Sequence, residues 1–141
     1  MIVKHITKPS ELNIAFDIRK KVFVEEQGVP LENEFDQYEN SAEHILVYYN
    51  DIPVGTGRLR IVDGIAKLER ICVLASHRKY GLGKLIVQKL EEIAKKKGLI
   101  KSKLHGQVQA EQFYTKLGYH KESHIFMEEE IPHILMIKDL S

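Results

Sequence analysis

The chain has 141 residues, which is enough for one hydrophobic core, and we expect a single domain over residues 1–141. Hydrophobic residues make up 43% and charged residues 29% of it, which excludes a disordered chain, a collagen and a disulfide-rich miniprotein. The 21 basic and 20 acidic side chains leave a net charge of +1, too near neutral for a nucleic-acid coat or a polybasic membrane anchor. We therefore expect no nucleic-acid partner.

Cysteine content and hydropathy indicate the compartment. Cys72 is the single cysteine, so the chain cannot form an internal disulfide, which suits a reducing environment. Its neighbours Ile71 and Val73 favour a buried strand residue over a reactive thiol. There is no apolar run of signal-peptide length, and no window approaches the roughly 18 apolar residues of a membrane span. These features predict a cytoplasmic protein without a membrane partner.

Strands and helices alternate along the chain. A short strand is expected at 2–6, followed by a helix from Ser10 to about Phe23 whose apolar residues recur at intervals of three and four. Residues 25–43 lack apolar periodicity and contain a glycine and a proline, which predicts a long loop with room for a short helix. A loop of this length in a small domain is usually functional.

The remaining elements define the fold class. Short turns that include Asp63-Gly64 join three expected strands, at 44–50, 53–62 and 66–73. Gly55 and Gly57 indicate a bulge or the close approach of another group. An amphipathic helix is expected at 81–97, and the alternation then repeats with a strand at 100–105, a helix at 108–117 and strands at 119–128 and 133–139. This order predicts an α/β fold, with helices flanking a mixed, mostly antiparallel central sheet of about six to seven strands.

The most informative pattern is a strand that leads through a loop with Gly81 and Gly83 into the amphipathic helix. The helix N-terminus leaves backbone N–H groups unpaired, and glycines let the backbone approach a ligand closely, which suits a phosphate or pyrophosphate. Arg78, Lys79 and Lys84 put positive charge where the helix dipole favours negative charge, so an anion among them would offset that cost. A solvated basic loop with a glycine turn is the alternative.

Other motifs for ligands and metals do not fit. A Walker loop requires Ser or Thr at the position of Leu85, and a dinucleotide fingerprint requires Gly or Ala at the position of Ile86. Glu130 and His133 have E-x-x-H spacing, but Pro132 prevents the helix that would direct both at a metal. We therefore expect neither NTP hydrolysis, nor hydride transfer, nor a metal site.

Two segments of the chain carry recognisable motifs. An R-x-x-G-x-G run ends at Gly83. About thirty residues later follows an A-x-x-F-Y-x-x-x-G-[FY] run, formed by Ala110, Phe113, Tyr114, Gly118 and Tyr119. Together they resemble the signatures of the GNAT superfamily of N-acetyltransferases, in which the first run is the acyl-CoA pyrophosphate loop. The segments VFVEEQGVP and IPHILMIK further resemble a bacterial subgroup of small acetyltransferases. The resemblance implies a GNAT-like acyl-CoA N-acyltransferase fold, with acetyl-CoA as co-substrate.

The resemblance also implies the residues that contact acetyl-CoA. The strand before the loop would offer backbone groups to the pantetheine arm, and the loop amides would hold the pyrophosphate. Gln107 stands where many members carry Asn, so it keeps the amide on a longer side chain. The implied cofactor-binding residues are Ile71, Cys72, Val73, Arg78, Lys79, Tyr80, Gly81, Leu82, Gly83, Lys84, Gln107, Ala110 and Tyr114.

Acetyl transfer to an amine needs donors for an oxyanion, a proton for the leaving thiolate and a base for the acceptor. The resemblance implies Tyr114 as the general acid; the alternative is a core aromatic beside Phe113. Glu69, just before the cofactor-contacting strand residues, is the first candidate for the general base, and Glu25 and Glu26 come next. In the alternative interpretation, Glu69 pairs with Arg58, Arg60 or a lysine on a neighbouring strand.

The acceptor side is less defined by the sequence. Glu25 and Glu26 begin the long loop, and His105 is the one histidine expected beside the cofactor cleft, so these three are the candidate substrate-binding residues. Residues 25–43 carry seven acids and no Lys or Arg, whereas residues 67–103 carry eleven bases and three acids. The acidic loop favours a cationic amine as acceptor, with a merely solvated loop as the alternative.

Together these patterns predict an acetyl-CoA-dependent enzyme that transfers an acetyl group directly to a primary amine of a small molecule or peptide. The alternative is a non-catalytic acyl-CoA sensor or protein-interaction module on the same fold. Assembly is an open point, and the apolar C-terminal run HILMI is expected to be able to pair across a homodimer.

Overall fold

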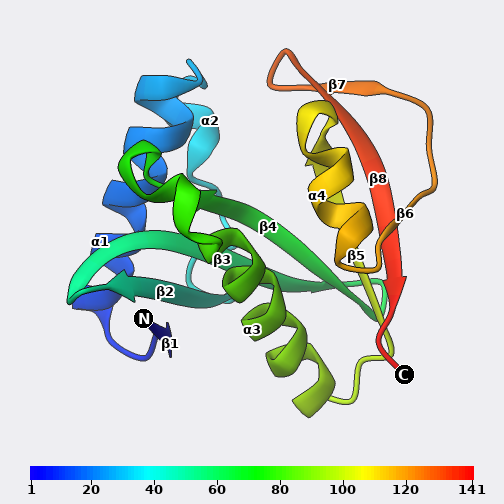
Figure 1. Cartoon of the computed structure of the whole chain (residues 1–141), viewed down its shortest axis with the longest axis horizontal. Coiled ribbons are helices and arrows are strands. Elements are labelled where there is room, and N and C mark those ends of the chain that lie inside the picture. The colour runs from blue at the N-terminus through cyan, green and yellow to red at the C-terminus, as the bar shows by residue number, and fades with distance from the viewer.

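One mixed sheet organises the computed structural model, which describes residues 1–141 (Figure 1). The strand order is β1-β2-β3-β4-β5-β8-β6, and β7 also pairs with β8. All neighbouring strands run antiparallel except β4 and β5, which run parallel. The predicted α/β class with a mostly antiparallel sheet is confirmed. The sheet has eight strands rather than six or seven, because the expected strand at 119–128 forms two short strands.

The elements follow the predicted order along the chain. The strands are β1 (Ile2–His5), β2 (Glu43–Tyr49), β3 (Ile52–Val62), β4 (Ile65–Val73), β5 (Lys101–Gln107), β6 (His120–Lys121), β7 (Phe126–Glu128) and β8 (Ile131–Asp139). The helices are α1 (Pro9–Arg19), the π-helical η1 (Lys20–Glu26), α2 (Leu31–Glu34), the 3₁₀ segment η2 (Ala75–Tyr80), α3 (Leu82–Lys96), the 3₁₀ segment η3 (Val108–Ala110) and α4 (Glu111–Lys116).

The helices differ from the prediction mainly at the N-terminal end. α1 begins at Pro9, with Lys8 rather than Ser10 at the capping position, because proline fits the first helical turn. η1 continues the helical path to Glu26, beyond the expected end at Phe23. α2 is the short helix expected inside the long loop. None of the helices is long and apolar enough to cross a membrane.

The sheet buries both of its faces under helices. Successive side chains of a strand point to opposite faces, so Ile45 packs with the α3 residues whereas its neighbour Leu46 packs with the α1 residues. In α3 the fully buried Ile86 and Leu90 lie on one face, as the amphipathic pattern predicts. Burying each such aliphatic side chain stabilises the fold by roughly 1.5–3 kcal/mol.

Both predictions for the glycines of β3 are confirmed. A Cβ at Gly57 would lie 2.6 Å from Ile86 Cγ2, so only glycine lets α3 approach the sheet this closely. The register of β3 and β4 shifts between Thr56 and Arg58, which leaves two residues of β4 opposite Gly57. Arg70 lies in this bulge with φ at 56°. The bulge turns the following part of β4 relative to its neighbours.

β4 and β5 pair along only part of their length. The parallel pairing joins Ala66–Leu68 to Ser102–Leu104, and beyond these residues the two strands diverge (Figure 1). β5 stays paired with β8 along its whole length. The edge of β4 that follows the bulge is therefore free of its neighbour on this side, and this divergence shapes the functional site.

β8 is an interior strand of the sheet. One edge pairs with β5, and the other pairs with β7 near Ile131 and with β6 near Ile137. Between these pairs, Glu122 N donates to Leu135 O. The expectation that the HILMI run pairs across a homodimer is therefore wrong, because both edges of β8 are already occupied within one chain.

Candidate active site

The divergence of β4 from β5 opens a cleft of about 710 Å³, a size typical of small-molecule sites. The residues that line it between Val22 and Val73 come from η1, α2, β3 and β4, and we call them the N-terminal wall. Those between Leu104 and His133 come from β5, α4, β7, β8 and their connections, and we call them the C-terminal wall. The start of α3 closes one end.

Most of the predicted cofactor residues line this cleft. They are Ile71, Cys72, Val73, Arg78, Gly81, Gly83, Gln107, Ala110 and Tyr114. The side chains of Lys79, Tyr80 and Lys84 are exposed outside the lining. The side chain of Leu82, the first residue of α3, is 1% exposed and points into the core, so only its backbone is able to contact a ligand. The structure therefore brings the two sequence signatures together at one site.

The N-terminus of α3 has the geometry expected of an anion site. Gly81 adopts φ of 71°, a left-handed conformation that favours glycine, and no side chain caps the first turn. A Cβ at Gly83 would lie 3.1 Å from Phe113 Cζ, so this glycine lets α4 pack against the loop. Exposed Lys79 and Lys84 lie next to these amides in sequence. The uncapped amides and the two cations together suit a phosphate-bearing ligand.

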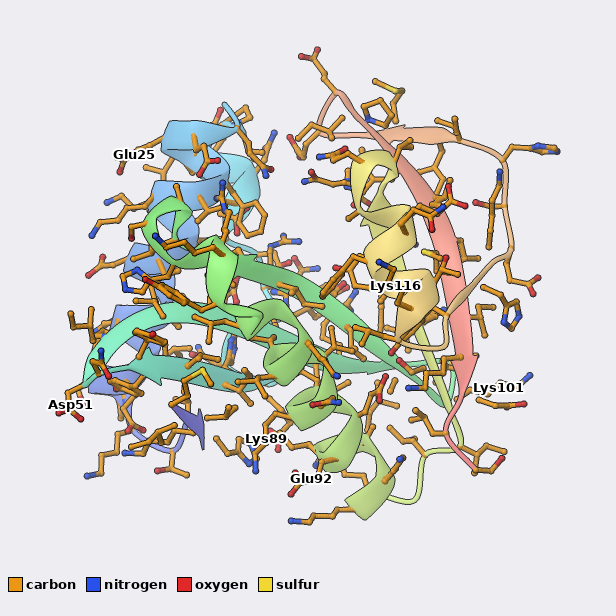
Figure 2. The ribbon with its side chains drawn as sticks, viewed as in Figure 1. Glu25, Asp51, Lys89, Glu92, Lys101 and Lys116 are labelled. Atoms are coloured by element: carbon orange, nitrogen blue, oxygen red, sulfur yellow. The ribbon has the colours of Figure 1, made fainter.

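Arg78 links the loop to two other segments. Its Nε donates to Val73 O at 2.9 Å, and its terminal nitrogens donate to the two carboxylate oxygens of Glu26 at 2.5 and 2.6 Å. The hydrogen bond from Arg78 lowers the pKa of Glu26. Glu26 therefore pairs with Arg78 from outside the cleft, and Glu25 projects from the outer side of η1 (Figure 2). Neither candidate substrate-binding glutamate lines the cleft.

Tyr114 is buried at the junction of α4 and β5. A Cβ at Gly106 would lie 3.2 Å from Tyr114 Cδ2, so the glycine makes room for the ring. Edge-to-face contacts with Phe113 and Tyr119 fix the plane of the ring. Burial raises the pKa of Tyr114 to about 12, with a smaller contribution from Cys72. The hydroxyl thus keeps its proton at neutral pH and makes no hydrogen bond within the chain, which leaves it available to a ligand.

Glu69 lies within a cluster of cations. Its Oε1 accepts from Arg58 Nη2 at 2.6 Å and from Arg60 Nε at 2.7 Å, and its Oε2 lies 3.1 Å from Lys67 Nζ. Burial opposes ionisation, but the hydrogen bond from Arg60 and the charges of Arg58 and Lys67 outweigh it and lower the pKa of Glu69 to about 2. A carboxylate with occupied lone pairs and so low a pKa is a weak base. The structure favours the ion-pair alternative for Glu69.

The ion pairs extend through the whole N-terminal wall. Arg19 is 1% exposed and binds the carboxylates of Glu34 and Glu39, and Arg58 also binds Asp36. Arg70 pairs with Glu34 from the bulge in β4. Three of the seven acids of residues 25–43, namely Glu34, Asp36 and Glu39, are therefore compensated by arginines of α1, β3 and β4.

The C-terminal wall is organised around a histidine. His105 Nδ1 lies 2.9 Å from Glu128 Oε1, and the imidazole packs edge-on against Phe126 at 5.0 Å between ring centroids. The hydrogen bond from His105 lowers the pKa of Glu128. His133 stacks on the same Phe126, and its Nδ1 donates to Ile131 O. His105 lines the cleft, as expected, and Glu128 is a partner that the sequence interpretation missed.

Two hydrogen bonds join the walls across the cleft. Gln107 Nε2 donates to Gln27 Oε1 at 3.0 Å, and Asn33 Nδ2 donates to Glu129 Oε2 at 3.1 Å. Glu129 and Glu130 form the turn between β7 and β8 with φ of 51° and 60°, values that favour Asn or Gly. The sequence interpretation missed Gln27, Asn33 and Glu129, because no turn signal marks the hairpin.

Comparison with known proteins identifies the family. The acetyltransferase (GNAT) domain family matches residues 9–140, so the chain belongs to this acetyltransferase family. A candidate acetyltransferase of Bacillus subtilis strain 168 is 55% identical over 141 residues, with 98% of this chain and 96% of that protein covered. The crystal structure of a candidate N-acetyltransferase from Lactobacillus plantarum superposes with a TM-score of 0.91 at 29% identity, covering 99% of this chain and 98% of the other.

The fold recurs in an aminoglycoside 6′-N-acetyltransferase solved in complex with coenzyme A. That structure superposes with a TM-score of 0.77 at 17% identity and covers 100% of this chain and 98% of the other. The likeness shows a shared fold. The resemblance drawn from the two sequence signatures is thus confirmed at the level of family and architecture.

Proposed function

We propose that this protein is an acetyl-CoA-dependent N-acetyltransferase that transfers the acetyl group directly to a primary amine. One observation carries the proposal: a single cleft runs from the uncapped N-terminus of α3, along the free edge of β4, to the buried phenol of Tyr114. These three features are an anion site, a hydrogen-bonding strand edge and a proton donor. Their order along the cleft matches the order of the pyrophosphate, the pantetheine amides and the thioester in acetyl-CoA.

The residues of this chain fit acetyl-CoA as a substrate. The first-turn amides of α3, with Lys79 and Lys84 nearby, would bind the pyrophosphate. Backbone groups of Ile71–Val73 would bind the amides of the pantetheine arm, because the pairing with β5 ends before these residues. Gln107, at the end of β5, carries an amide side chain that donates to Gln27. On binding of acetyl-CoA, Gln107 would exchange this hydrogen bond for one to the pantetheine arm.

Tyr114 is the proposed general acid. Its phenol retains its proton at neutral pH and faces the cleft without an internal partner, so it is able to protonate the departing thiolate. Backbone N–H groups at the free edge of β4 would stabilise the oxyanion that forms when the amine attacks the carbonyl carbon. No covalent intermediate on the protein is required.

The acceptor is proposed to be a primary amine of a small molecule or peptide. The compensated ion pairs of the N-terminal wall remove part of the support that residues 25–43 gave to a cationic acceptor. Glu128 and Glu129 of the C-terminal wall line the cleft and are the remaining acids able to meet an ammonium group.

The test combines two assays on the wild-type protein. Calorimetry measures binding of acetyl-CoA, and thiol release in the presence of amines, amino sugars and peptides measures turnover. We expect binding and acetylated product with at least one class of primary amine. Tight binding of acetyl-CoA with no turnover of any acceptor would instead support the acyl-CoA sensor.

A further inference from the structure

The proposed transfer needs a base, because amines are largely protonated near neutral pH. The carboxylates of the N-terminal wall are poorly suited to this role. Arginine binds Asp36 and Glu69, whose pKa values are lowered. Burial raises the pKa of Glu34, but its side chain is 3% exposed and already bound by arginines. The C-terminal wall differs, since its ionisable groups face one another without a Lys or Arg within ion-pair distance.

We infer that His105 is the general base that deprotonates the acceptor amine, and that Glu128 is the positioning residue that orients its imidazole. This inference rests on the proposed function and adds to it the residue that accepts the proton. Two observations support this role: His105 lines the cleft, and its Nδ1 lies 2.9 Å from Glu128 Oε1.

The contact with Glu128 determines which nitrogen of His105 is free. An ionised carboxylate only accepts hydrogen bonds, so the Nδ1 that lies 2.9 Å from Glu128 Oε1 carries the proton in the neutral ring. The lone pair then resides on Nε2, which has no partner within the chain. The His105 side chain is 29% exposed, so Nε2 is accessible to an acceptor in the cleft.

Packing holds the ring in this orientation. Phe126 meets the imidazole edge-on at 5.0 Å, and His133 stacks on the same phenyl ring. His133 is less suited to the role of base: its side chain is 9% exposed, its Nδ1 donates to Ile131 O, and its Nε2 faces Glu128 Oε2 at 3.7 Å. His105 is therefore the histidine whose ring is held by neighbouring residues and whose second nitrogen is accessible.

His105 and Tyr114 lie on opposite faces of β5. Gly106 faces α4, where its Cβ position would touch the ring of Tyr114, and successive strand residues point to opposite faces. His105, the preceding residue, thus reaches the cleft from the face opposite Tyr114. An acceptor beside His105 and a thiolate protonated by Tyr114 would therefore be served from opposite faces of β5.

The proton transfers balance. His105 Nε2 takes one proton from the ammonium group and releases it to water, and the free amine forms the C–N bond. The C–S bond then breaks, and the thiolate takes the phenolic proton of Tyr114. The second nitrogen proton leaves through His105, and a proton from water restores the phenol. One ammonium and one thioester give one amide, one thiol and one released proton.

The tautomer of His105 is the direct test and requires no turnover. Long-range ¹H–¹⁵N NMR spectra of the full-length protein, recorded well above the ordinary pKa of histidine, report which ring nitrogen carries the proton, and His105→Gln assigns the signal. We expect the Nδ1–H form in the wild type and a shift toward the Nε2–H form in Glu128→Ala, which removes the acceptor. A wild-type Nε2–H form, or a tautomer unaffected by Glu128→Ala, overturns the inference.

Kinetics with an amine that the wild type acetylates completes the test. His105→Asn keeps a donor near Glu128 but lacks the basic nitrogen, and we expect kcat to fall by about 10²–10⁴-fold with acetyl-CoA affinity retained. Added imidazole should partly restore His105→Ala. His124→Asn, on an exposed histidine outside the cleft, is the matched control.

The outcomes separate the two proposals. If the wild type acetylates amines and His105→Asn keeps its kcat, the inference is wrong while the proposed function stands. If the wild type binds acetyl-CoA and acetylates nothing, the proposed function fails, and the catalytic role of His105 fails with it, whatever the tautomer.

Discussion

The two walls of the cleft hold their ionisable groups in opposite ways. In the N-terminal wall, Arg58 and its carboxylate partners form a closed set of ion pairs in which each carboxylate already accepts from an arginine. In the C-terminal wall, one imidazole nitrogen of His105 is fixed by Glu128, and the other makes no hydrogen bond within the chain. A carboxylate or imidazole at the right place is therefore not enough for proton transfer; it must also keep an unoccupied lone pair.

Removing one member of this closed set of ion pairs should have the largest effect on the free energy of unfolding. The Arg58 side chain is 1% exposed, so Arg58→Leu removes a buried cation that binds Asp36 and Glu69 and leaves Glu69 with only Arg60 and Lys67. We expect the free energy of unfolding to fall by about 3–5 kcal/mol, measured by urea denaturation. The control is Lys89→Ala on the outer side of α3, where the pairing with Glu92 is partly exposed (Figure 2) and less than about 0.5 kcal/mol should be lost. Equal losses in the two variants would contradict the description of this wall.

Acid should weaken the N-terminal wall through Glu69. Its pKa in the folded state is lowered to about 2, so its ion pairs stabilise the fold above the ordinary pKa of glutamate and are lost as the pH falls from about 4.3 toward 2. The contribution is about 3 kcal/mol. Unfolding free energies measured across this range should show a steeper decline for the wild type than for Glu69→Gln. Glu25→Gln, at an exposed glutamate outside these ion pairs, should keep the wild-type slope.

Tyr114→Phe tests the acid of the proposed reaction. Because its hydroxyl makes no hydrogen bond within the chain, the loss should leave the unfolding free energy nearly unchanged. The kcat should fall by roughly 10–100-fold, and acetyl-CoA affinity should stay close to that of the wild type. Steady-state kinetics and calorimetry measure both quantities. A kcat equal to that of the wild type would exclude Tyr114 from the acid role.

The smallest effect is expected where the walls meet. The hydrogen bond from Asn33 to Glu129 is exposed and joins residues on short, surface segments. Asn33→Ala should change the unfolding free energy by less than about 0.5 kcal/mol, measured by urea denaturation. A loss comparable to that of Arg58→Leu would show that this contact, rather than the buried ion pairs, holds the N-terminal wall in place.

The fold was predictable where local signals agree. Asp63-Gly64 forms a two-residue turn with positive φ at both positions, which places the strands around it in one register. Counting back from this turn puts Arg58 opposite Glu69, so the ion pair that occupies Glu69 was accessible from the sequence. The glycines of β3 likewise gave both the bulge and the close approach of α3.

The C-terminal half of the site was not predictable in the same way. His105 and Glu128 lie 23 residues apart and meet only because β8 pairs with both β5 and β7. Glu129 and Glu130 form the turn that sets the register between β7 and β8, and their left-handed conformations are unusual for glutamate. Tertiary pairing, which no local pattern records, thus decides this part of the site.

The most direct measurement is the kcat of His105→Asn and Glu69→Gln, each assayed where urea denaturation shows it to be folded. We expect opposite results for the two variants. In His105→Asn, kcat should fall by about 10²–10⁴-fold while the unfolding free energy stays nearly unchanged. In Glu69→Gln, the unfolding free energy should fall while kcat stays within about threefold of the wild type. A folded Glu69→Gln protein without activity, together with a fully active His105→Asn protein, would contradict the account.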